Sequence, residues 1–171
     1  MKDFFRFFTT DDIADYMVSI LYPIPSLYND YKHVDIVLVP SAGDGALIKA
    51  LNRYSEQLTT IAIEVNPEYK EGLKKIASST FITDIFNPDF DLGIRVDATI
   101  ANLLFDGDND IDKHLHKICE LTKYRGTIVS IVPEDYNLQY IHEVYPITNW
   151  VTNKDGRIIP IKIIKFSNTI L

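Results

Sequence analysis

Short apolar runs alternate with amphipathic segments along most of the chain. The run from Ile36 to Val39 holds four apolar residues, three of them β-branched, which predicts a strand buried on both faces within a parallel sheet. Similar runs predict further strands at residues 60–65, 79–83, 96–101 and 127–132. Apolar residues at helical spacing predict helices at about 11–21, 46–54, 68–77 and 111–121. This alternation indicates parallel βαβ units.

The C-terminal end has a different pattern. Residues 147–152 and 158–166 are strand-like runs joined by Asn153-Lys154-Asp155-Gly156, a turn sequence typical of a β-hairpin. Pro160 has no amide hydrogen to donate, so we expect it at a sheet edge or at a bulge. The chain has 171 residues, of which 46% are hydrophobic, and we expect it to form a single α/β domain.

Charge and cysteine content narrow the classes of function. A formal net charge of −7 argues against nucleic-acid binding through a general positive field, while it permits a local basic face. The single cysteine, Cys119, excludes an internal disulfide and has the spacing of a buried helical residue. The sequence has no apolar run of membrane-spanning length, and we expect no targeting segment. We therefore expect a soluble cytoplasmic protein with no membrane partner.

A glycine-containing turn follows the first predicted strand. Its sequence is Ser41-Ala42-Gly43-Asp44-Gly45, and the two glycines permit backbone angles that other residues adopt only at a cost. In a βαβ unit such a turn directs backbone amides to the carboxyl edge of the sheet, where a polar or anionic ligand is favoured. The alternative is a turn with a structural role only.

Acidic residues end the second and third predicted strands. A carboxylate at Glu64 can accept both hydroxyl groups of a ribose, and one at Asp84 can accept from an exocyclic amine such as that of adenine. The alternative is that both are ordinary solvated acids. Their joint placement after a glycine turn favours a ligand site.

Alternating aspartates precede the helix predicted at 111–121. A calcium loop would need glycine at Ile111 and glutamate at Lys117, so we interpret the run as a solvated loop. His114 and His116 are two residues apart, and on a helix they face different ways. We therefore expect no metal site. The aspartates of the run are Asp106, Asp108, Asp110 and Asp112.

Several segments, taken in order, resemble one known family. They are residues 7–14 (Phe-Phe-Thr-Thr-Asp-Asp-Ile-Ala), 40–45 (Pro-Ser-Ala-Gly-Asp-Gly), 63–67, 83–86 and 97–105. Over about residues 5–166 the chain resembles class I S-adenosylmethionine-dependent methyltransferases that modify the adenine amino group in DNA. The resemblance implies a Rossmann-like fold, with a mostly parallel seven-stranded sheet and a C-terminal antiparallel hairpin. It implies S-adenosylmethionine as the cofactor.

The resemblance also implies which residues contact the cofactor. Glu64 would hold the ribose, Asp84 would accept from the adenine amino group, and Val65 and Ile85 would enclose the adenine ring. The N-terminal segment and the glycine turn would border the methionine end. The residues implied there are Phe8, Thr9, Pro40, Ala42, Gly43 and Gly45.

The implied catalytic residues are Asn102 and Phe105. Asn102 would orient the target amine through its side-chain oxygen, and Phe105 would stack on an extruded base. The segment here reads Asn-Leu-Leu-Phe where the family has Asn-Pro-Pro-Phe or Tyr, so Leu103 and Leu104 replace two conformationally restricted prolines. Val39 also stands where the family usually has an acid.

These features support three hypotheses. The first is a methyltransferase for the adenine amino group in DNA, with a DNA or protein partner that supplies target recognition. The second is a pseudoenzyme that keeps the fold and acts as a binding or regulatory subunit, as the altered motif indicates. The third is a methyltransferase for another nitrogen, in a protein or a small molecule, since acidic residues near the site suit a cationic acceptor. The sequence does not define the oligomeric state.

Overall fold

The computed structural model describes residues 9–23, 36–103, 111–139, 142–147, 151–152 and 158–169. The helical elements are α1 (Asp11–Leu21), α2 (Ala46–Tyr54), the 3-10 turn η1 (Pro67–Tyr69), α3 (Lys70–Leu73) and α4 (Ile111–Leu121). The first strands are β1 (Ile36–Pro40), β2 (Thr59–Glu64), β3 (Ser79–Ile82), β4 (Val96–Asn102) and β5 (Thr122–Pro133). The later strands are β6 (Glu143–Pro146), β7 (Val151–Thr152), β8 (Ile158–Ile159) and β9 (Ile161–Ser167).

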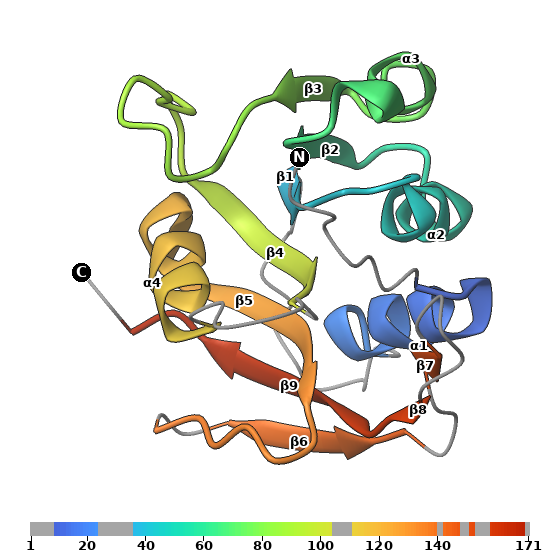
Figure 1. Ribbon diagram of the computed structural model, residues 1–171, viewed down its shortest axis with the longest axis vertical. Coiled ribbons are helices and arrows are strands. Elements are labelled where there is room, and N and C mark those ends of the chain that lie inside the picture. Colours follow the sequence, from blue (N-terminus) through green and yellow to red (C-terminus); the bar gives the residue numbers. More distant parts are fainter. Residues whose placement is uncertain are drawn as a thin grey trace.

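Seven strands form one sheet in the order β3-β2-β1-β4-β5-β9-β6 (Figure 1). Strands β1 to β5 pair in parallel, and β9 is antiparallel to both of its neighbours, β5 and β6. The predicted Rossmann-like, mostly parallel seven-stranded sheet is therefore confirmed. The sheet order reverses direction at β1 and β4, which is where open α/β sheets bind ligands at their carboxyl edge.

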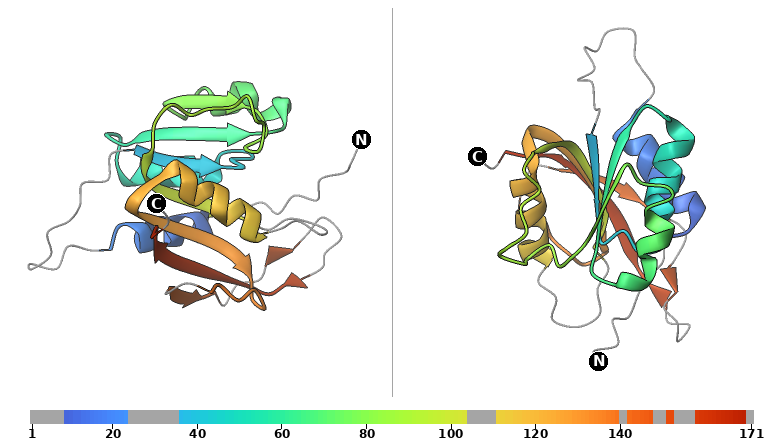
Figure 2. Two further views of the ribbon diagram at one scale, coloured as in Figure 1. Left: turned by 90° about the vertical axis from the view of Figure 1, so that its left-hand side faces the viewer. Right: turned by 90° about the horizontal axis from the view of Figure 1, so that it is seen from above.

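Helices cover the sheet from both sides (Figures 1 and 2). α1 and α2 pack on one face, where their buried apolar side chains, including Met17 and Leu51, join a core with Val39 of β1. α4 covers part of the other face through Leu115 and Ile118. The rest of that face lies under the irregular segment between β3 and β4, whose packing residues are Ile85, Phe86, Phe90 and Leu92.

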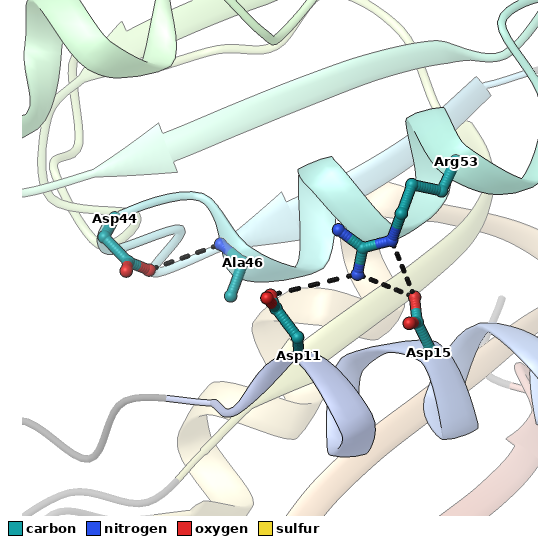
Figure 3. Close-up of polar contacts among 5 residues, drawn as sticks. All are labelled: Asp11, Asp15, Asp44, Ala46 and Arg53. Atoms are coloured by element: carbon teal, nitrogen blue, oxygen red, sulfur yellow. Dashed lines mark hydrogen bonds and ion pairs between the residues drawn. The ribbon is translucent and has the colours of Figure 1, made fainter.

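An arginine connects α1 to α2 on the protein surface (Figure 3). Arg53 of α2 donates two hydrogen bonds to Asp15 of α1, at 3.1 and 2.7 Å, and lies 3.8 Å from Asp11. All three side chains are about half exposed or more. Such a pair contributes little to stability, on the order of 0–1 kcal/mol, so the apolar contacts between the helices hold them together.

The third helical segment is shorter than predicted. A helix was expected at about 68–77, but the structure has η1 followed by a four-residue α3. Gly72 lies in that segment, and glycine costs helix stability because of its backbone freedom. Asn66 starts η1, where its side chain accepts the Glu68 N–H.

The C-terminal strands also differ in detail from the prediction. Within the strand expected at 147–152, the described strand residues are those of β7, which pairs with β8 in a separate two-stranded sheet. β6, which joins the main sheet at residues 143–146, was not predicted. The predicted turn at Asn153 to Gly156 lies outside the described residues. Pro160 lies between β8 and β9. β8 belongs to the two-stranded sheet and β9 to the interior of the main sheet, so Pro160 interrupts the strand expected at 158–166 where the chain passes from one sheet to the other.

Two further expectations can be compared with the structure. Cys119 is buried, as predicted, and burial raises the pKa of its thiol to about 11. Within the described ranges, every helix is too short or too polar to cross a membrane.

Candidate functional site

The glycine turn after β1 uses left-handed backbone angles three times. Ser41, Gly43 and Gly45 have φ values of 55°, 56° and 84°. A Cβ atom added to Gly45 would collide with the Ile76 side chain, so this glycine permits close packing of α2 against the segment after α3. A Cβ atom at Gly43 would meet no heavy atom of the described residues within 4 Å. The described residues therefore leave space at Gly43 for a ligand.

Glu64 lies beside this turn and is buried, with 6% of its surface exposed. Its Oε2 accepts the Gly43 N–H at 2.7 Å, and its Oε1 accepts the Asn66 N–H at 2.8 Å. Among the described residues, no cation forms an ion pair with it. The carboxylate is thus fixed by two backbone donors, and each oxygen keeps a lone pair for a further hydrogen bond.

The other predicted turn residues lie where they shape the site. Pro40 ends β1 and is buried. Ala42 is 8% exposed, and its N–H donates to the Ile63 carbonyl of β2 at 2.9 Å. Both residues therefore anchor the turn to the sheet, and their side chains belong to the protein interior.

Val65 and Ile85, predicted to enclose an adenine ring, differ in exposure. Val65 is 51% exposed at the end of β2, beside Glu64. Ile85 is only 7% exposed and packs in the core with Leu38 and Val96. Val65 is available to a ligand, whereas Ile85 fixes the turn after β3 to the core.

Asp84 begins the turn after β3 and is exposed. Its Oδ1 accepts the Phe86 N–H at 2.9 Å, and its carbonyl accepts the Asn87 N–H at 3.0 Å. The neighbouring Thr83 N–H donates to the Glu64 carbonyl at 2.9 Å. The turns after β2 and β3 are therefore joined, and both acids lie at the carboxyl edge.

Asn102 and Thr9 meet although 93 residues separate them in the sequence. Asn102 ends β4, and Thr9 lies just before α1. The Nδ2 of Asn102 donates to Thr9 Oγ1 at 3.1 Å. Because the amide nitrogen faces Thr9, the amide oxygen faces away from it. Phe8 and Phe105, the other predicted residues of this region, lie outside the described residues.

The residue after Asn102, Leu103, points into the core and away from the site. Its side chain is fully buried in the core beneath α4, and its N–H donates to the Ile131 carbonyl at 3.1 Å. A proline at this position would lose that hydrogen bond. Leu104 lies outside the described residues.

The first turn of α4 forms contacts that the sequence did not predict. Phe86 meets the His114 ring edge-on, with centroids 4.7 Å apart, and Lys113 Nζ lies 4.4 Å from the Phe86 centroid. Tyr136, after β5, donates to Asp112 Oδ1 at 2.5 Å. No spacing signal in the sequence connects these residues, because two separate loops and the first turn of α4 bring them together.

Metal binding finds no support in the described part of the chain. No group of three metal-ligating side chains occurs there. His114 packs on Phe86, and His116 pairs with Glu120 at 3.4 Å on another side of α4. The two histidines therefore point to different surroundings, as their spacing predicted.

No protein-family model and no curated protein matches this chain. Solved structures with the same fold include a precorrin-6y C5,15-methyltransferase from Geobacter metallireducens GS-15, which is 17% identical, with a TM-score of 0.62 over 94% of this chain and 89% of that one. An rRNA methylase from Streptococcus thermophilus is 12% identical, with a TM-score of 0.58 over 96% and 100%. The plantazolicin methyltransferase BpumL, solved with a substrate analogue and SAH, is 13% identical, with a TM-score of 0.56 over 69% and 46%. The chain has the Rossmann-like fold of class I S-adenosylmethionine-dependent methyltransferases.

Proposed function

We propose that this protein binds S-adenosylmethionine at the carboxyl edge of its sheet and transfers the methyl group to a nitrogen atom. The observation that carries the proposal is the buried Glu64 carboxylate, held by two backbone amides beside the open space at Gly43. A carboxylate fixed in this way can accept both ribose hydroxyl groups without reorganising. The residues present therefore fit a nucleoside cofactor.

Two further residues support recognition of the adenine end. Val65 offers an exposed apolar surface beside Glu64, and Asp84 offers a carboxylate from the next turn. S-adenosylmethionine, when bound, supplies an electrophilic methyl group on sulfur. The protein's part is to place that group opposite an acceptor nitrogen and to exclude competing geometries.

Asn102 is suited to hold the acceptor. A nitrogen that gained a methyl group would lose a proton to solvent, and its lone pair would have to point at the methyl carbon. The amide oxygen of Asn102 can accept a hydrogen bond from the N–H of the substrate nitrogen. This bond would leave the nitrogen lone pair directed at the methyl carbon. Thr9 accepts from the amide nitrogen and so orients the amide group.

The first candidate acceptor is the adenine amino group of DNA, which the sequence resemblance favours through Asn102. A DNA or protein partner would then supply target recognition, because the exposed side chains around the carboxyl edge are largely acidic. The described acids there are Asp44, Asp84, Asp112, Glu134 and Asp135. They repel a phosphate backbone.

The second candidate is a neutral or cationic amine in a protein or small molecule, which the same acidic surroundings favour. The third reading is a regulatory subunit that binds the cofactor and transfers nothing, because leucines replace the prolines of the catalytic motif.

A transfer assay with methyl-labelled S-adenosylmethionine separates these readings. The acceptors are single- and double-stranded DNA, an adenosine mononucleotide and a lysine-rich protein. Labelled DNA supports the first candidate, labelled protein the second, and cofactor binding without any transfer the third. Asn102→Ala should abolish transfer. Asn52→Ala is the control and should not, because Asn52 lies in the last turn of α2, at the end of that helix far from the glycine turn. Equal transfer by wild type and Asn102→Ala would contradict the assigned role.

A further inference from the structure

The first turn of α4 connects two loops at the carboxyl edge. Lys113 and His114 contact the Phe86 ring in the turn after β3. On the same turn, Asp112 accepts from Tyr136 in the loop after β5, at 2.5 Å. α4 therefore supports the turn that carries Asp84 and is itself supported from the other side.

The direction of the Asp84 carboxylate depends on Phe86. Asp84 is exposed, and its Oδ1 accepts the Phe86 backbone N–H at 2.9 Å. Ile85 is buried in the core, which fixes the middle of the turn. The Phe86 side chain fixes the other end, through one ring contact and one cation–π contact with α4.

We propose that Lys113 and His114 are positioning residues for adenine recognition, an inference that rests on the proposed function. They hold Phe86, Phe86 holds the Asp84 carboxylate, and Asp84 accepts from the cofactor's amino group. Neither residue touches the cofactor in this account. Their effect is on selectivity: the carboxylate favours a purine with an amino group and disfavours hypoxanthine, which presents an oxygen there.

The test compares two ligands that differ at C6 and N1 of the purine. S-adenosylhomocysteine carries an amino group at C6 and a lone pair on N1, whereas S-inosylhomocysteine carries an oxygen at C6 and a hydrogen on N1. Affinities are measured by calorimetry for wild type, Phe86→Leu, Lys113→Met and His114→Leu. Lys117→Met is the matched control, because it removes an equivalent charge one turn further along α4, where Lys117 pairs with Glu120.

We expect wild type to prefer the adenine compound at least tenfold. Each of the three variants should reduce the preference to about threefold or less and leave the affinity for the inosine compound within twofold of wild type. Lys117→Met should keep the wild-type ratio. Adding Lys113→Met to Phe86→Leu should cause no further loss, because Lys113 acts through the Phe86 ring.

Other outcomes overturn the inference in distinguishable ways. If the variants lower the melting temperature and keep the wild-type ratio, the cluster has a purely structural role. If wild type binds both compounds equally, Asp84 does not read the amino group, and the inference fails while the proposed function stands. If wild type binds neither compound, the proposed function fails and the inference fails with it.

Discussion

The two edges of the sheet use carboxylates differently. At the amino edge, Asp97 accepts the Ile36 N–H at 3.0 Å and the Lys123 ammonium at 2.6 Å, so a cation balances its charge. At the carboxyl edge, Glu64 accepts two backbone N–H groups, and among the described residues it has no cationic partner. The partners of Asp97 are therefore other residues of the same chain. The Glu64 carboxylate oxygens keep lone pairs for a ligand.

The amino edge is closed by a second polar contact. Asn168 is fully buried, and its Nδ2 lies 2.9 Å from the Cys119 carbonyl and 2.8 Å from the Thr122 carbonyl, where α4 passes into β5. Its own N–H donates to the Gly126 carbonyl at 2.8 Å. This edge therefore stabilises the fold, whereas the carboxyl edge leaves groups available for chemistry.

The largest effect on stability should come from Asn168→Ala. The substitution leaves buried carbonyl groups without their donor, which should lower the free energy of unfolding by roughly 2–3 kcal/mol. Urea denaturation measures this loss. Affinity for S-adenosylhomocysteine should stay unchanged, and a parallel loss of affinity would show that the two edges are not separate.

Glu64→Gln should weaken S-adenosylhomocysteine binding by about 2 kcal/mol, or roughly 30-fold, because it removes the charged acceptor of the ribose hydroxyl groups. Asp97→Asn is the matched change at the amino edge. It should lower stability by about 1 kcal/mol without changing affinity. Calorimetry measures the affinity of both variants for S-adenosylhomocysteine. If Glu64→Gln binds as tightly as wild type, Glu64 is not part of the site.

Gly43→Ala and Gly93→Ala form a second matched pair. Both glycines have positive φ, 56° and 71°, and an added Cβ atom meets no described heavy atom within 4 Å at either one. Each alanine should cost about 1 kcal/mol of stability from backbone strain. Only Gly43→Ala should weaken ligand binding, because Gly93 lies before β4, at the amino edge. Loss of binding in both variants would indicate a general effect of destabilisation.

At neutral pH the smallest effect concerns Cys119, because the shift in its pKa changes stability only at alkaline pH. Its pKa is raised to about 11 in the folded protein by burial, against about 9 for an unperturbed thiol, so folding favours the protonated form. The associated stability is present below pH 9 and is lost as the pH rises from about 9 to about 11. Urea midpoints across this range should fall more steeply for wild type than for Cys119→Ala. Parallel curves would contradict the shift.

The sequence predicted the cores of the five parallel strands, because their apolar runs are bounded by clear turn residues. The helix at residues 11–21 was predicted with its bounds, since its apolar residues repeat at helical spacing. The bounds of the helix expected at 68–77 were not predicted correctly. Gly72 and the start at Asn66 favour a shorter helical segment, which apolar spacing alone does not reveal. The position of β9 between β5 and β6 depends on long-range pairing, which local patterns do not encode.

Site prediction was limited by the directions of side chains. Ile85 and Phe86 are adjacent apolar residues in one turn, and the sequence does not say which enters the core. The hydrogen bond from the Phe86 N–H to Asp84 shapes the turn so that the Ile85 side chain enters the core. The contact between Thr9 and Asn102 was not predicted, because 93 residues separate them and no spacing in this chain connects them. The roles assigned to both residues stay predictions.

The most direct test of the central claim is a calorimetric titration of the wild-type protein with S-adenosylhomocysteine. Binding at micromolar affinity, about −8 kcal/mol, with a rise in melting temperature is the predicted result. It would show that the carboxyl edge holds a nucleoside cofactor. No detectable heat at millimolar ligand, together with an unchanged melting temperature, would contradict the account.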